Sequence, residues 1–237
     1  MKLFYILNLT AAASIAATAS ADITGAYVVE YSVNADDFGG ASVSVNVQDL
    51  YLSSDDSADV ALNVYNMTFA DSAKVTYFQG ATSTGWLAQN AGGPFDNPAL
   101  RRADSFVTIG GFEQDTAYPA QAQGAGAGTG LDPNFGGPNT AYPNDLSGWY
   151  NSSPPNLNGQ VGQVAQTDGT LGLGVLIGRF AYDGDFSLEG STLEVTWNQG
   201  LGTGSEQLDV PLTVIPAPGA IALLSLAGLL GRRRRRG

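Results

Sequence analysis

Alternation of side chains with a period of two is the feature that most constrains the fold of this chain. Tyr27, Val29, Tyr31 and Val33 occupy every second position, and residues 43–48 repeat the alternation strictly, apolar against polar. Successive side chains of an extended strand point to opposite faces. The pattern therefore predicts strands that place one face against a core.

The same reasoning predicts further strands at 60–69, 73–78, 105–109, 171–182, 193–197 and 207–214. No stretch shows apolar residues at helical spacing with capping residues at its ends. The 31 glycines and 11 prolines favour turns over helices. We therefore expect an all-β fold, an antiparallel β-sandwich or jelly-roll-like single domain with long loops, over residues 22–213.

Residues 171–178 combine glycines with apolar residues in a way that resembles a nucleotide-binding loop at first sight. The glycine spacing does not fit such a loop, the Gly-Lys-Ser/Thr ending is missing, and no helix pattern follows. We interpret this segment as a buried strand whose glycines permit close packing or bends.

The N-terminus has the layout of a secretory signal peptide. Lys2 gives a positive start, an apolar stretch begins at Leu3, and the segment closes on Ala19-Ser20-Ala21. Small residues at Ala19 and Ala21 suit cleavage after Ala21 by signal peptidase. The sequence predicts a signal peptide at 1–21; the alternative is an anchor that is not cut.

The C-terminus has three parts in a fixed order. Pro216-Ala217-Pro218 disfavours regular structure, and the uncharged apolar residues 219–231 follow it. As a helix these residues span roughly 20 Å at 1.5 Å per residue, less than the roughly 30 Å hydrocarbon core. The chain then carries a basic cluster of Arg232, Arg233, Arg234, Arg235 and Arg236. Such a cluster stays on the cytoplasmic side of a membrane and places the preceding domain outside.

Residues 214–237 resemble the PEP-CTERM sorting signal in this order of Pro-x-Pro, short apolar helix and terminal arginines. The resemblance implies processing by an exosortase, a membrane-embedded cysteine transpeptidase of bacteria that make exopolysaccharide. Ala217 stands where that family usually has glutamate. The resemblance covers the tail alone. The alternative is a simple membrane anchor that is never cleaved.

Charge and residue types exclude several classes of function. Residues 22–213 hold four basic residues, Lys74, Arg101, Arg102 and Arg179, against all 22 acidic residues, a formal charge of −18. That charge argues against nucleic acid and favours solubility or association with cations. The chain has no histidine and no cysteine, which argues against zinc and haem sites and removes the Ser-His-Asp and Cys-His nucleophile pairs.

One acidic turn is the candidate for a cation site. Asp183 and Asp185 flank Gly184, and Glu189 follows. Calcium takes six to eight oxygen ligands, which carboxylates at alternate positions of a turn can supply in part. The EF-hand order is absent, and the alternative is a solvated hairpin turn. We expect no cofactor other than this candidate calcium ion.

Two segments, 80–104 and 110–160, are predicted to be long loops. The second holds the candidate ligand-binding aromatics Tyr118, Tyr142, Trp149 and Tyr150. Long loops on a rigid scaffold often carry binding sites, and aromatic rings suit sugar ligands. The alternative is that these rings fold down and cover the sheet.

Together these features predict an exported, non-enzymatic protein of the cell surface or extracellular matrix. Its expected partners are signal peptidase, an exosortase-like enzyme, the membrane before processing, and exopolysaccharide. A second hypothesis is a carbohydrate-binding module, calcium-dependent or not. A third is a glycoside hydrolase or lyase that uses two carboxylates, because that chemistry needs no histidine.

Overall fold

The structure is a computed structural model that describes residues 22–36, 42–74, 77–79, 85–87, 103–109, 128–152, 159–166, 170–200, 202–207 and 212–216. These residues form strands and two short 3-10 helices. The strands are Ile23–Asp36 (β1), Ser42–Ser54 (β2), Val60–Thr68 (β3), Phe106–Val107 (β4), Thr129–Leu131 (β5), Ser147–Asn151 (β6), Gly162–Ala165 (β7), Leu171–Tyr182 (β8), Thr192–Asn198 (β9), Ser205–Gln207 (β10) and Leu212–Pro216 (β11). The 3-10 helices are Asp71–Lys74 (η1) and Pro133–Phe135 (η2).

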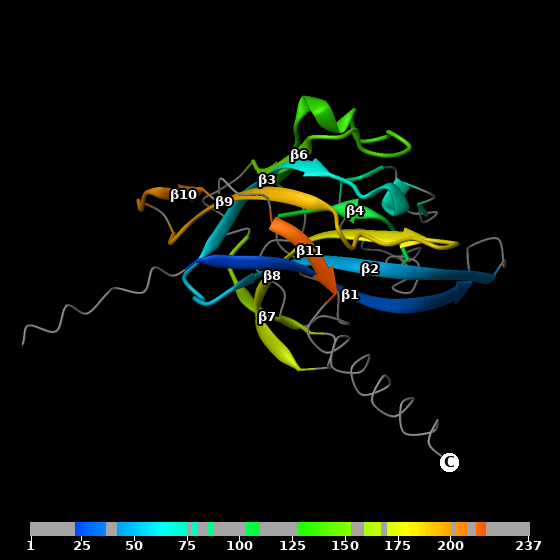
Figure 1. Ribbon diagram of the computed structural model, residues 1–237, viewed down its shortest axis with the longest axis horizontal. Coiled ribbons are helices and arrows are strands. Elements are labelled where there is room, and N and C mark those ends of the chain that lie inside the picture. Colours follow the sequence, from blue (N-terminus) through cyan, green and yellow to red (C-terminus); the bar gives the residue numbers. More distant parts are fainter. Residues whose placement is uncertain are drawn as a thin grey trace, which may run out of the picture.

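The strands pair in one continuous order, β4-β8-β2-β1-β11-β9-β3-β6-β5, with β7 beside β8 and β10 beside β9. We call β4-β8-β2-β1 with β7 the first half of the sheet, and β9-β3-β6-β5 with β10 the second half. β11 joins them, parallel to β1 on one side and antiparallel to β9 on the other. Figure 1 shows β11 between the β1 and β9 ribbons.

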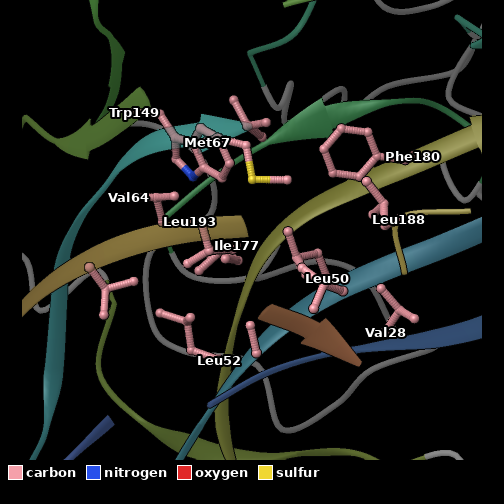
Figure 2. Close-up of a cluster of buried hydrophobic side chains, with 14 of the residues drawn as sticks. Val28, Leu50, Leu52, Val64, Met67, Trp149, Ile177, Phe180, Leu188 and Leu193 are labelled. Carbon is pink, nitrogen blue, oxygen red and sulfur yellow. The ribbon is translucent and has the colours of Figure 1, made fainter. Parts of the chain in front are cut away.

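The core lies between the two halves, because their strands direct apolar side chains toward each other. In β9, Leu193, Val195 and Trp197 are buried while the residues between them are partly exposed. In Figure 2, side chains of the second half, such as Val64, face side chains of the first half, such as Leu50. The largest buried side chains of this core are Trp86, Trp149, Phe135, Phe180, Leu50, Leu52, Met67 and Ile109.

Hydrogen bonds connect the two outer ends of the strand order. The Ile109 N–H donates to Thr129 Oγ1 at 3.1 Å, and Trp149 Nε1 donates to the Thr108 carbonyl at 3.0 Å. Trp86 bridges the same gap, because its N–H donates to the Pro138 carbonyl and its carbonyl accepts from the Val107 N–H. The sheet is therefore almost closed on itself, with few free edge groups on this side.

Residues 159–165 form a second link between the halves. The Ala61 N–H donates to the Gly159 carbonyl, and the Val161 N–H donates to the Asp59 carbonyl, so this segment begins against β3. It then continues as β7, which pairs with β8 in the first half. The link fixes the β2–β3 turn close to the start of β7.

The all-β class is confirmed, and the strands predicted at 60–69, 171–182 and 193–197 match β3, β8 and β9 closely. The strand pairs are antiparallel among the described residues, apart from β1 with β11. The first two strands are longer than their alternating cores suggested. Of the strand predicted at 105–109, only Phe106–Val107 pairs as a strand.

Three predictions differ from the structure. The expected strand at 73–78 is wrong in its described part, because residues 71–74 form η1 and Phe78 bonds to both Ala181 and Ser105 without joining a strand. The expected loop at 110–160 contains β5 and β6. The expected strand at 207–214 is described at its two ends, as β10 and β11, which begin earlier, at Ser205, and end later, at Pro216.

Residues 171–178 form a strand as interpreted, buried from Gly174 onward, and its glycines lie in tight places. A Cβ atom on Gly174 would lie 2.5 Å from the Leu52 carbonyl oxygen, and one on Gly172 would lie 2.7 Å from Gln166 Nε2. A bulge follows where the register changes between the Leu50–Gly178 and Tyr51–Leu176 pairs. Glycine thus allows β8 to lie close to β2 and to bend.

We expect Gly174→Ala to destabilise the fold by about 1–3 kcal/mol, because the added methyl group meets backbone rather than a movable side chain. Gly184→Ala is the matched control, since a Cβ atom there meets nothing within 4 Å. Urea unfolding of both variants measures the difference. Equal stability of the two variants would contradict this packing.

Candidate functional sites

The predicted cation turn lies between β8 and β9 and is open to solvent. Asp183, Asp185 and Glu189 are all exposed. Within the described part of the chain, no group of three or more carboxylates is placed to hold a metal ion. The turn that the sequence singled out for calcium is an exposed connection from β8, in the first half of the sheet, to β9, in the second half.

Two of the candidate aromatics belong to the core. Trp149 is 1% exposed, and its ring lies edge-on against Phe135 at a centroid distance of 6.3 Å. Tyr142 packs against Phe69 at 5.0 Å, its hydroxyl donates to the Ala73 carbonyl, and burial raises its pKa. Both rings are therefore used to cover the core. Tyr118 lies outside the described residues.

Tyr150 is the described aromatic candidate that faces outward, with 44% of its surface exposed. It lies in a row across four strands, between Gly130 on β5 and Asn63 on β3, with Thr196 on β9 next in line. Its ring lies over Gly130, where a Cβ atom would be 2.4 Å from Tyr150 Cζ. We call Gly130, Tyr150, Asn63 and Thr196 the Tyr150 row.

The neighbouring row points the opposite way, which sets the orientation of the Tyr150 row. Leu131, Trp149, Val64 and Val195 are the residues of that neighbouring row. All four belong to or pack against the hydrophobic core. Since strand side chains alternate between faces, the Tyr150 row lies on the outer face of the second half.

The residues of the predicted processing signals lie mostly outside the described residues. These are Ala19, Ala21, Ala217, Pro218, Arg232, Arg233, Arg234, Arg235 and Arg236. Of the predicted sorting motif only Pro216 is described, and at the other end Asp22, directly after the predicted cleavage position, is described. Pro216 ends β11 opposite Val28, and Asp22 precedes β1 with its backbone N–H donating to Asp55 Oδ1 at 2.8 Å.

The sequence analysis did not predict a buried ion pair that lies in the first half of the sheet. Arg179 on β8 stands directly opposite Asp49 on β2, and the two form a bidentate pair through Nε–Oδ1 at 2.7 Å and Nη2–Oδ2 at 3.0 Å. Their side chains are 1% and 0% exposed. The Tyr31 hydroxyl donates to Asp49 Oδ2 at 3.2 Å, and the guanidinium lies 5.1 Å from the Phe106 ring centroid.

A signal for this pair was present in the sequence. Arg179 is the only charged residue in an otherwise apolar or glycine-rich strand at 171–182. A charge in a buried strand requires a partner, and an acidic residue at the centre of a neighbouring strand supplies one. Asp49 meets that condition, although the sequence alone does not give the strand order.

The turn between β2 and β3 holds a second acidic cluster, Asp55, Asp56 and Asp59. Asp59 is 0% exposed, its Oδ2 accepts from the Ser54 hydroxyl at 2.7 Å, and its Oδ1 has no hydrogen-bond partner. Burial raises the pKa of Asp59, and the Asp56 and Asp55 charges raise it further against the hydrogen bonds. Among the described residues, no lysine or arginine forms an ion pair with this turn.

No protein-family model matches this chain, and neither a curated protein nor a solved structure matches it. Among the described residues we find no helical segment with the length and hydropathy that a bilayer crossing requires.

We expect Asp49→Asn to destabilise the fold by about 3–5 kcal/mol, because Arg179 would keep its buried charge without a carboxylate. Replacing both residues, as Asp49→Leu with Arg179→Met, should cost less than the sum of the two single changes. Urea unfolding of the natural chain, of Asp49→Leu, of Arg179→Met and of the double variant gives the coupling energy between the two side chains. Asp183→Asn, at an exposed carboxylate, should change stability by no more than about 0.5 kcal/mol. Additive single changes would show that the two charges do not depend on each other.

Proposed function

We propose that this chain is an exported, non-enzymatic protein of the cell surface or extracellular matrix, sorted through its C-terminal tail. The proposal combines the predicted signal peptide at 1–21, the tail that resembles the PEP-CTERM signal, and the absence of histidine and cysteine. Its partners would be signal peptidase and an exosortase-like enzyme. We further propose that the two halves of the sheet form a sandwich-like fold around their shared core.

The position of the Pro-x-Pro motif is the observation that carries this proposal. Val214 is fully buried in the core, and the sheet pairing continues to Pro216, the first proline of the motif. Every described strand therefore lies before Ala217. The predicted tail at 214–237 overlaps the end of β11, but its part from Ala217 onward can be anchored in a membrane or removed without taking any strand from the sheet.

Mass spectrometry of the protein from its native cells tests this proposal at both ends. We expect a mature N-terminus at Asp22 and the loss of Arg232–Arg236 by processing. Ala217→Glu, which gives the usual Pro-Glu-Pro sequence, should be processed at least as completely as the natural tail. Changing all five arginines to glutamine should prevent processing, because the stop signal is lost. Recovery of the intact chain from the soluble cell interior would contradict the proposal.

A carbohydrate-binding role is the second candidate, and the Tyr150 row favours it. The exposed ring of Tyr150 offers an apolar face, and the partly exposed Thr196 offers a hydroxyl group two strands away in the same row. This combination suits a sugar, whose ring has apolar C–H faces and polar hydroxyl edges. Exopolysaccharide is the matching partner for a matrix protein.

We expect Tyr150→Ala to weaken binding to any glycan found on an array by roughly tenfold or more, as for other central aromatic contacts. Leu171→Ala is the control, because Leu171 is an exposed apolar residue on β8, away from the row. The array is read with and without a calcium chelator. Absence of glycan binding in both conditions would rule out this second role.

A further inference from the structure

We infer that cleavage after Ala21 creates an ion pair, in which the new α-ammonium group of Asp22 binds Asp55 and fastens β1 to the β2–β3 turn. The inference rests on the proposed export and on its cleavage position. It assigns to the acidic turn a ligand of defined chemistry, the mature N-terminus of the same chain. Export processing would thereby stabilise the fold that it releases.

The geometry for this pair is already present in the backbone. Asp22 N lies 2.8 Å from Asp55 Oδ1, and the Asp55 N–H donates back to the Asp22 carbonyl at 3.4 Å. Ile23 pairs with Ser54 at the start of β1, so the strand register holds the two residues together. The amide nitrogen needs no movement to become the nitrogen of an ammonium group at the same place.

The turn that accepts the hydrogen bond from Asp22 N is acidic, and none of its residues 55–59 is basic. The turn contains Asp55, Asp56 and Asp59, and the side chains of Gln160 and Gln199, which do not titrate, contact Asp59. The Asp59 Oδ1 atom is buried in this turn without a partner. Among the described residues, Arg179 is bound to Asp49 in the first half and is therefore not available here.

Cleavage changes the charge at this position and leaves its hydrogen bond in place. Before cleavage the nitrogen is a neutral amide that donates one hydrogen bond. After cleavage it is an ammonium group that donates to the Asp55 carboxylate, and charge-assisted hydrogen bonds are stronger than neutral ones. The contact is near the surface, so we expect a modest gain of the size measured for exposed ion pairs.

The direction of the pH dependence follows from linkage. The ion pair raises the pKa of the α-amino group in the folded chain above its value in the unfolded chain. An unfolded α-amino group titrates near about pH 8. The extra stability is therefore complete at pH 6 and is lost as the pH rises through the folded-state pKa.

The test compares the chain from Asp22 to Gly237 with a free α-amino group and with the same group acetylated. Acetylation keeps the N–H donor and removes the charge. At pH 6 we expect the free chain to melt about 1–3 °C higher, and the difference should vanish near pH 10. Asp55→Asn should abolish the difference, whereas Asp185→Asn, at an exposed and distant carboxylate, should preserve it.

The outcomes separate this inference from the proposed function. Because the N-terminus is defined in the test chain, the result does not depend on where the native cell cuts. Equal melting temperatures of the free and acetylated chains at pH 6 would overturn the ion pair, even if the native N-terminus is Asp22. A difference that survives Asp55→Asn would overturn Asp55 as the partner.

Discussion

The parallel pairing of β11 with β1 is the interaction on which the rest of the structure depends. Through Ala26–Val214, Tyr27–Ile215 and Val28–Pro216, a strand of five residues turns two groups of strands into one sheet. Val214 lies in the core between them. Without β11, the first and second halves would each expose an apolar face and an unpaired strand edge, and isolated sheets of this kind tend to aggregate.

Joining the halves in this way leaves the first half with two buried faces. One faces the shared core, and the other holds its own apolar clusters around Tyr51 and Val47. The Asp49–Arg179 pair lies on this second face, surrounded by Tyr31 and Phe106. An ion pair in such a place adds little net stability, but it favours one register between β2 and β8. A slip of β8 by one residue would turn Arg179 to the other face and leave Asp49 buried without its partner.

The sequence predicted strands whose apolar residues alternate or form a long continuous run, and missed short strands that contain glycine. β9 was visible because a period of two persists over its length, and β8 because residues 171–182 are almost all apolar or glycine. β5 and β6 were hidden because Gly130 and Gly148 stand within them, and both are needed for close contacts, with the Tyr150 ring and with the Val64 carbonyl. The sequence could not predict that Trp149 is buried, because its burial depends on which strands lie across the core from β6. The strand order itself, and with it the Asp49–Arg179 pair, requires contacts between residues far apart in sequence.

The order of elements along the chain has a consequence for when this fold can form. β11 is the last described strand, and it pairs with β1, the first, so the sheet stays in two parts until residues 212–216 are available. A contact between the two ends of a chain is slow to form, because loop closure must come first. On the proposed export route this delay is useful, since a chain that crosses a membrane before folding meets its closing strand only at the end of transit. The mature N-terminus would lie at the start of β1, and the sorting motif begins at the end of β11. The two expected processing positions therefore lie on neighbouring strands, and the pairing of these strands completes the sheet.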